Sequence, residues 1–232
     1  MLSKSRILYN LISNGCKNIR FFSIPLPNED ICIQVSETDK IIGSVGKMEC
    51  HKQPLSLHRA FSVFLFDENK KLLLQKRSQK KVTFPGVWSN TCCSHPLYND
   101  KEINENGNIG VKLAASRRMG QELGLWNINE NNFEVAGKFL YKAVMDDVWG
   151  EYELDYSLLL KCFNGTHLCN INKNEVDEIK LVNYNELQDM IRNGEPFSPW
   201  FLLFNNQGYV KKWFDDLDTN TISTNPNTIY KL

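Results

Sequence analysis

Three of the four histidines lie beside polar turns, and two glutamates share one predicted strand. His51 and His58 flank a short loop before an apolar segment, and His95 ends a polar loop. Glu151 and Glu153 are two residues apart in a strand-like segment, so both side chains point to one face. Three imidazoles and two carboxylates would suit Mg²⁺, Mn²⁺ or Zn²⁺. A solvated strand face and ordinary hydrogen-bonding histidines are the alternative interpretation.

A cysteine and a helical ion pair extend the candidate chemistry. Cys93 stands two residues before His95, where a cation or backbone N–H groups would lower the pKa of its thiol and make it a base or nucleophile. A buried structural cysteine is the commoner alternative, and the adjacent Cys92 suits that role. Arg118 and Glu122 lie four residues apart on a predicted helix. They form either a simple ion pair or a phosphate-binding cation beside a Mg²⁺ ligand.

Composition limits the class of protein to which these residues belong. Charged residues make up 23% and apolar residues 42% of the 232 residues, which excludes wholesale disorder. The balance of 27 basic and 27 acidic residues argues against a surface built to bind nucleic acid. No apolar run approaches the ~20 residues that span a bilayer. Seven cysteines without a paired CxxC motif indicate a reducing compartment and mostly free thiols.

The balance of charge is uneven along the chain. Residues 1–28 contain four basic and no acidic residues, so this segment carries +4 and the rest of the chain −4. Such a segment resembles an organelle import presequence, and 20–23 resembles a mitochondrial processing site; a plain tail is the alternative. The last three residues resemble a peroxisomal signal only loosely. We therefore expect a cytoplasmic or mitochondrial protein.

Alternating strand-like and helix-like segments predict a single α/β (α+β) domain that positions these residues. Strands are predicted as two hairpins and three later segments, at 31–35 with 41–47, 60–67 with 71–77, and 135–147, 150–161 and 176–184. Helices are predicted at 109–123 ending before Gly124, at 185–194 capped by Asn185, and at 198–217 with a possible interruption at Gly208. We expect an N-terminal extension over 1–29, the domain over 30–217 and a loose tail over 218–232.

Four motifs occur in an order that is typical of one enzyme family. They are HRAFSVF at 58–64, FPGVWSNTCCSHP at 84–96, WGEYE at 149–153 and SPWF at 198–201. Together they resemble type I isopentenyl-diphosphate Δ-isomerase, whose Nudix fold implies a mixed β-sheet sandwiched between helices. Residues 117–125 resemble a Nudix box in which Arg118 and Gln121 stand where hydrolases carry glutamates. That difference argues against diphosphate hydrolysis.

The resemblance implies a role for each candidate residue. It makes Glu122 a ligand of the Mg²⁺ that the diphosphate carries. The implied ligands of one further divalent ion (Mg²⁺, Mn²⁺ or Zn²⁺) are His51, His58, His95, Glu151 and Glu153. The implied catalytic residues are Cys93, Glu153 and Tyr141. The implied substrate-binding residues are Lys47, Arg77, Lys81, Ser94, Arg118 and Trp200.

The implied reaction interconverts isopentenyl and dimethylallyl diphosphate through a tertiary carbocation, within isoprenoid biosynthesis. Glu153, assisted by Tyr141, would act as the acid, Cys93 as the base, and Trp200 as the aromatic face that stabilises the cation. We expect a monomer with a small-molecule substrate and no nucleic-acid or membrane partner. The rival interpretations are a Nudix hydrolase, a non-catalytic metal-binding module, and a thiol enzyme that pairs Cys93 with His95.

Overall fold

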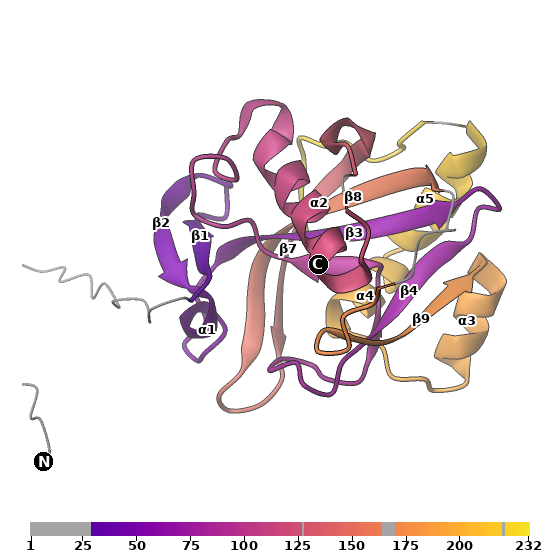
Figure 1. Ribbon diagram of the computed structural model, residues 1–232, viewed down its shortest axis with the longest axis horizontal. Helices are drawn as coiled ribbons and strands as arrows, with labels where there is room; N and C mark the ends of the chain where they lie inside the picture. The colour runs from indigo at the N-terminus through magenta and orange to yellow at the C-terminus, as the bar shows by residue number, and fades with distance from the viewer. Residues whose placement is uncertain (1–28, 127, 164–169, 220) are drawn as a thin grey trace, which may run out of the picture.

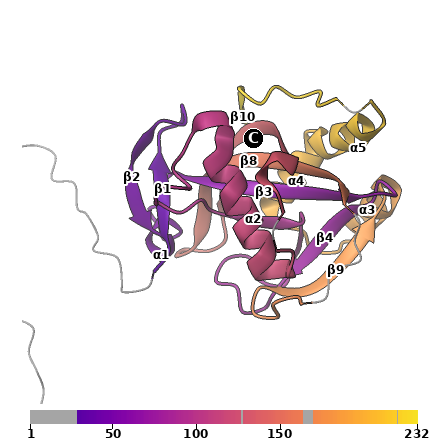
Figure 2. The ribbon, with the colours of Figure 1, turned by 45° about the horizontal axis from the view of Figure 1, so that its top comes forward.

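The strands form one mixed sheet with helices against both faces (Figures 1 and 2). The computed structural model describes residues 29–126, 128–163, 170–219 and 221–232. The strands are β1 (Ile31–Val35), β2 (Ile41–Gly46), β3 (His58–Asp67), β4 (Leu72–Arg77), β5 (Trp88–Ser89), β6 (Cys92–Ser94), β7 (Phe133–Val144), β8 (Gly150–Phe163), β9 (Val176–Val182) and β10 (Ile229–Lys231). The helices are α1 (Lys47–Cys50), α2 (Ile109–Leu123), α3 (Tyr184–Arg192), α4 (Pro199–Asn206) and α5 (Tyr209–Thr219), with short 3₁₀ turns at Asn106–Asn108 and Glu130–Asn132. The predicted leader lies outside the described residues.

The central strand β3 is buried along its whole length, as expected of a strand covered on both faces. The main strand order is β10-β7-β8-β3-β1-β2, and β6 also pairs with β3. The alternation of β3 divides the core, because Phe61 and Val63 pack with α2 whereas Phe64 and Phe66 pack with α4 and α5. The fold therefore has the predicted sheet between helices.

Both predicted hairpins form, but the second one opens into two parts of the sheet. β1 and β2 pair antiparallel along their length. β3 and β4 share only the pair Phe66–Leu72, after which β4 continues with β5 and β9. This divergence leaves β3 free to pair with β8 on one side and with β6 near its middle.

A β-bulge in β7 changes which face each residue occupies. The register with β8 shifts between Val135 and Gly137, so Ala136 is the extra residue. Before the bulge, Phe133 packs in the core beside α2; after it, Phe139 and Tyr141 pack in the core beside α4 and α5. The bulge therefore directs Tyr141 to the face that carries the candidate site.

The predicted helix 109–123 is confirmed, and Gly124 ends it in a left-handed conformation with φ of 73°. The predicted cap of α3 is wrong by two residues. Asn183 is the N-cap, because its side chain accepts from the Glu186 N–H while the Glu186 carboxylate accepts from the Asn183 N–H, a capping box. The predicted interruption at Gly208 is confirmed, since α4 and α5 are separate helices.

The expectation of a loose tail is wrong for residues 229–231. These residues form β10, which pairs in parallel with β7, and the Tyr230 ring stacks on Phe139 with centroids 5.2 Å apart. Among the described residues, no helix has the length and apolar character needed to cross a bilayer.

Candidate active site and metal centre

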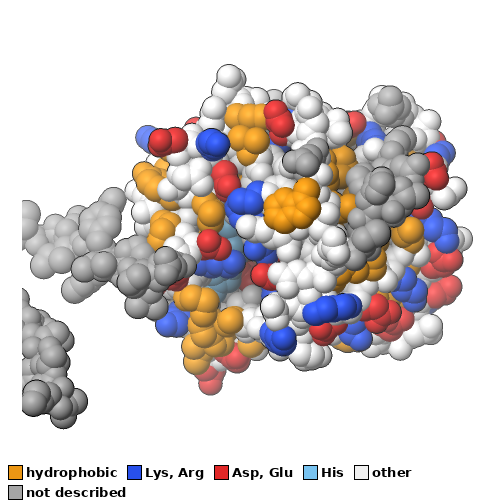
Figure 3. Space-filling view, viewed as in Figure 1, with side chains coloured by type: hydrophobic (Ala, Val, Ile, Leu, Met, Phe, Trp, Pro, Cys, Tyr) orange, Lys and Arg blue, Asp and Glu red, His pale blue; other side chains and the backbone are white. Residues whose placement is uncertain are grey.

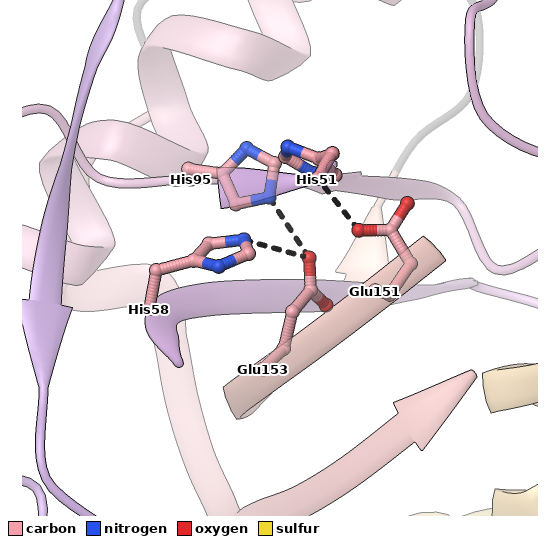
Figure 4. Close-up of side chains that lie close together, drawn as sticks. All are labelled: His51, His58, His95, Glu151 and Glu153. Atoms are coloured by element: carbon pink, nitrogen blue, oxygen red, sulfur yellow. Dashed lines mark hydrogen bonds and ion pairs between the residues drawn. The ribbon is translucent and has the colours of Figure 1, made fainter. Parts of the chain in front are cut away.

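The five residues predicted as ligands of one ion meet in a single buried cluster (Figure 4). His51 follows α1, His58 begins β3, and His95 follows β6. Glu151 and Glu153 lie on β8, and the pairing of β3 with β8 sets His58 directly beside Glu153. One potential ligand atom from each residue lies within 4.8 Å of all the others, and every residue is buried.

Hydrogen bonds orient the imidazoles toward the two carboxylates (Figure 4). His51 Nδ1 lies 2.6 Å from the Lys47 carbonyl oxygen, and His58 Nδ1 lies 2.8 Å from that of Ser56. A carbonyl oxygen can only accept, so these Nδ1 atoms carry the protons and the Nε2 atoms face the cluster. Carbonyl contacts of this kind orient histidine ligands at metal sites.

The donor set fits a divalent cation. Nε2 of His51 lies 2.8 Å from a Glu151 oxygen, and Nε2 of His95 lies 2.8 Å from Glu153 Oε1. Nε2 of His58 is buried, has no hydrogen-bond partner among the described residues, and lies 3.5 Å from the same Glu153 oxygen. Burial by itself lowers the pKa of His51, but the Glu151 carboxylate outweighs it and raises the pKa to about 9. Burial and the neighbouring imidazoles lower the pKa of His95 well below its ordinary value, so this ring is neutral, as a ligand must be. The two carboxylates therefore favour a cation beside them, which Mg²⁺, Mn²⁺ or Zn²⁺ would supply.

A cavity of about 430 Å³ opens beside this cluster. Figure 3 shows histidine surface at the bottom of a hollow, among Lys or Arg and Asp or Glu side chains. The predicted site residues that line the cavity are His51, His95, Glu151, Glu153, Cys93, Tyr141, Lys47, Arg77, Lys81, Ser94 and Trp200. His58 lies behind the wall as part of the cluster, whereas Arg118 and Glu122 do not line the cavity.

Cys93 faces the cavity from β6, whereas Cys92 faces the core beside α2. Burial raises the pKa of the Cys93 thiol to about 11, although the Arg77 guanidinium, 3.6 Å from Sγ, opposes this effect. The expectation of a lowered thiol pKa is therefore wrong, because desolvation outweighs the nearby cation. Cys93 is a thiol at neutral pH.

Glu153 and Tyr141 face each other across β7 and β8. Their backbones are register partners, and the Tyr141 hydroxyl donates to Glu153 Oε2. Burial by itself raises the pKa of Glu153, but contacts with His58 and the Tyr141 hydroxyl outweigh it, so the net pKa is lowered. Burial, followed by the charge of Glu153, raises the pKa of Tyr141 well above its ordinary value, so the phenol remains a donor.

An aromatic wall completes the buried end of the cavity. The Trp200 indole is 3% exposed, and its Nε1 donates to Asn90 Oδ1 over 3.2 Å. Its ring lies 6.4 Å from that of Tyr141 and 5.2 Å from the Arg77 guanidinium carbon. These contacts hold the indole in one orientation against the cavity.

The predicted Mg²⁺ ligand Glu122 is engaged in a buried ion pair. It accepts a hydrogen bond from Arg118, and Lys81 Nζ lies 3.8 Å from it. Burial by itself raises the pKa of Glu122, but Lys81 and Arg118 outweigh it and lower the pKa to about 2. Lys81 also contacts Glu175 at 2.5 Å, so this network reaches the cavity wall.

The cavity includes residues to which the sequence analysis assigned no role. Trp149 lies within a quoted motif, but its place in the wall depends on the turn between β7 and β8. Lys80, Asn174 and Glu175 come together because β4 pairs with β9. No local pattern in the sequence marks that pairing.

Comparisons with known proteins agree with this site. Residues 56–201 match the family described as NUDIX domain. The chain is 41% identical over 219 residues to "Isopentenyl-diphosphate Delta-isomerase II" of Clarkia breweri, covering 88% of this chain and 75% of that protein. It is 42% identical to "Isopentenyl-diphosphate Delta-isomerase II, chloroplastic" of Arabidopsis thaliana, covering 88% and 76%.

Solved structures support the fold alone. A NUDIX hydrolase from Alicyclobacillus acidocaldarius superimposes with a TM-score of 0.51 at 12% identity, covering 72% of this chain and 97% of that chain. A Deinococcus radiodurans protein gives 0.50 at 14% identity, covering 76% and 98%. The matched domain, the identity over most of the chain and the arrangement of the cavity together show that this chain belongs to the isopentenyl-diphosphate Δ-isomerase family, with a Nudix fold.

Proposed function

We propose that this protein is an isomerase that interconverts isopentenyl diphosphate and dimethylallyl diphosphate in isoprenoid biosynthesis. One observation carries the proposal: Cys93 and the Tyr141–Glu153 pair line the same cavity as the His/Glu cluster. The names of the relatives, all isopentenyl-diphosphate Δ-isomerases, support the same reaction.

The reaction moves one double bond by adding a proton at one carbon and removing a proton at another. Protonating the terminal carbon of the alkene gives a tertiary carbocation, and loss of a proton on the diphosphate side gives the allylic product. An acid and a base on two sides of the substrate divide this work. Cys93 on β6 and Glu153 on β8 are the proposed pair.

The pKa values of Cys93 and Glu153 indicate that Cys93, and not Glu153, holds the proton in the enzyme before substrate binds. Burial keeps Cys93 a thiol, whereas the contacts of Glu153 favour its carboxylate. The sequence analysis gave the opposite roles. Because the reaction is reversible, each group must act as acid in one direction and as base in the other. A turnover leaves the two groups with exchanged protonation, so a proton must return before the next identical turnover.

Trp200 is the proposed stabiliser of the carbocation. The face of an aromatic ring attracts a cation through its quadrupole, which contributes roughly 2 kcal/mol or more in a desolvated site. The indole and the Tyr141 ring are both almost fully buried. Their burial also excludes the water that would otherwise trap the cation.

The cations and the metal sites are proposed to bind and orient the diphosphate. Lys47, Arg77, Lys81 and Ser94 line the cavity, and Arg118 reaches it through Glu175. The His/Glu cluster would hold a divalent ion that adds fixed positive charge beside Glu153, and Glu122 would contact Mg²⁺ that accompanies the diphosphate. Binding the diphosphate away from the reacting carbons supplies the positioning energy for the proton transfer.

A direct assay tests the proposal. Purified protein would be incubated with isopentenyl diphosphate and Mg²⁺, with and without chelator, and the acid-labile allylic product measured. We expect product with metal and none with chelator. No product with any of the three divalent ions would refute the isomerase function, and release of inorganic phosphate would favour the rival hydrolase.

We also propose that residues 30–217, together with the strand β10 that joins their sheet, form the catalytic domain, that it acts as a monomer, and that it needs neither nucleic acid nor membrane. We propose that residues 1–29 are a targeting segment, with a cytoplasmic protein as the alternative. The word "chloroplastic" in the name of the Arabidopsis relative supports an organelle leader in that protein. Fusing residues 1–29 to a fluorescent reporter tests this, because a diffuse cytosolic signal would remove the mitochondrial proposal. Light scattering of the purified protein tests the monomer.

A further inference from the structure

Lys80 is an exposed cation at the cavity, in the turn that follows β4. It stands between Arg77 and Lys81, two residues already proposed to bind the diphosphate. Unlike the almost fully buried Arg77, Lys80 lies at the solvent side of the cavity. The sequence analysis assigned it no role.

Two of the four Lys and Arg residues on the cavity wall are already paired with carboxylates. Five carboxylates also line the cavity, so without metal the Lys and Arg charges do not exceed the carboxylate charges. Lys47 Nζ lies 3.5 Å from Asp30, and Lys81 Nζ lies 2.5 Å from Glu175. Arg77 has neutral partners, the carbonyl oxygens of Phe84 and Thr83, which fix its guanidinium beside Cys93 and Trp200 at the buried end of the cavity.

The Lys80 ammonium has a neutral partner. Its Nζ donates to the Asn174 side-chain oxygen over 2.7 Å, and within the described ranges it makes no ion pair with a carboxylate. An amide oxygen does not cancel the positive charge. The charge of Lys80 therefore remains available to an anion in the cavity.

The structure also restricts where this long side chain lies. The Ser78 N–H donates to the Glu175 carbonyl oxygen over 3.0 Å, and the Ser78 hydroxyl donates to the Lys173 carbonyl oxygen over 3.0 Å. These bonds join the turn that carries Lys80 to the segment that carries Asn174. Lys80 therefore loses less conformational freedom on binding an anion than an unattached surface lysine would.

We propose that Lys80 contacts the terminal phosphate of the substrate and so contributes to the preference for a diphosphate over a monophosphate. The reacting carbons must lie at the buried end, against Cys93, Glu153 and Trp200. The phosphate farthest from those carbons then extends toward the solvent side, where Lys80 lies. This inference rests on the proposed isomerase function.

The test compares Lys80→Met, Lys80→Arg and the control Lys212→Met, which removes an exposed lysine from α5, outside the cavity lining. For Lys80→Met we expect the KM for isopentenyl diphosphate to rise about tenfold, equivalent to about 1.4 kcal/mol, while kcat changes by less than about twofold. Lys80→Arg should retain most of the affinity, and Lys212→Met should match the unmodified protein. The KM of Lys80→Met should also depend less steeply on salt.

The outcomes separate the inference from the function on which it rests. A KM for Lys80→Met equal to that of Lys212→Met, or a loss confined to kcat, would overturn the role of Lys80 and leave the isomerase function intact. If the unmodified protein gives no allylic product, the proposed function fails, and binding of inorganic diphosphate with Mg²⁺ still tests Lys80. Lys80→Met should then weaken diphosphate binding about tenfold and leave monophosphate binding unchanged; equal effects on both would overturn the proposal.

Discussion

Replacing Tyr141 by Phe removes one hydroxyl from the site and leaves the ring in place. That hydroxyl donates to Glu153 in a buried setting, and a hydrogen bond to a charged group contributes about 1.5–3 kcal/mol. If this free energy acts in the transition state, turnover should fall about 10- to 160-fold. Removing the bond should also raise the pKa of Glu153, because Tyr141 helps to lower it.

The chain offers a matched control in Tyr156. Its hydroxyl also donates to a carboxylate, that of Asp39, and its exposed fraction of 4% is close to the 3% of Tyr141. Tyr156 packs in the core beside α2 and does not line the cavity. Tyr156→Phe and Tyr141→Phe should therefore both lower the melting temperature, by about 3–12 °C, but only Tyr141→Phe should lose turnover.

The assay is formation of the allylic product across a range of pH, with circular dichroism to follow thermal unfolding. A carboxylate whose pKa is raised is ionised only at higher pH, so the acidic limb of kcat/KM should move to higher pH in Tyr141→Phe. Unchanged turnover in this variant, or an equal loss in Tyr156→Phe, would refute the assignment of Tyr141 to the site.

Three further perturbations test other parts of the site. Cys93→Ser should lower turnover by orders of magnitude while Cys92→Ala keeps it, and near-normal isomerisation by Cys93→Ala would contradict the role of Cys93. Chelation should abolish activity and lower stability by about 3 kcal/mol if the ion is normally present at about 100 times its Kd, with Zn²⁺, Mn²⁺ and Mg²⁺ compared by reconstitution; activity that persists in chelator would contradict the metal centre. Glu122→Gln should lower stability, but by less than the about 3–5 kcal/mol expected when a buried partner is left unpaired, because Arg118 keeps Glu175 at 3.3 Å. The pKa of Glu122 is lowered to about 2, so its contribution to stability is present above the ordinary value of 4.5 and lost as pH falls toward 2; acid unfolding of Glu122→Gln should therefore depend less on pH over that range, and an unchanged dependence would count against the ion pair.

Local signals in the sequence predicted the elements well where a cap or an alternation marks them. The predicted bounds of the helix 109–123 are correct at both ends. Its C-terminal end was predictable because Gly124 is a clear termination signal. The N-cap of α3 was predicted at the wrong residue because Asn183 and Asn185 are both good N-cap residues. The capping box between Asn183 and Glu186 makes Asn183 the N-cap. β10 was not predicted because three residues are too few to show the alternation of apolar and polar side chains that marks a strand. Its pairing with β7 joins segments that are far apart in the sequence.

The candidate site depended on information that the sequence does not hold locally. The spacing of Glu151 and Glu153 predicted a shared face, but only the pairing of β8 with β3 brings His58 to them. The pKa of Cys93 was predicted in the wrong direction, because burial is a tertiary property and here outweighs the adjacent cation. The motif resemblance supplied the remaining residues.

The bulge at Ala136 makes the length of β7 as important as its composition. Side chains alternate with a period of two, so in a regular strand Phe133 and Tyr141, eight residues apart, would lie on one face. The extra residue sets them on opposite faces, beside Leu160 and Glu153 respectively. Deleting Ala136 would leave them seven residues apart in a regular ladder with the same partners, so this deletion should be tolerated. Inserting one residue between Gly137 and Tyr141 would instead turn Tyr141 to the face of Phe133, away from Glu153, and should abolish activity or folding. The bulge therefore lets this strand lose one residue but not gain one.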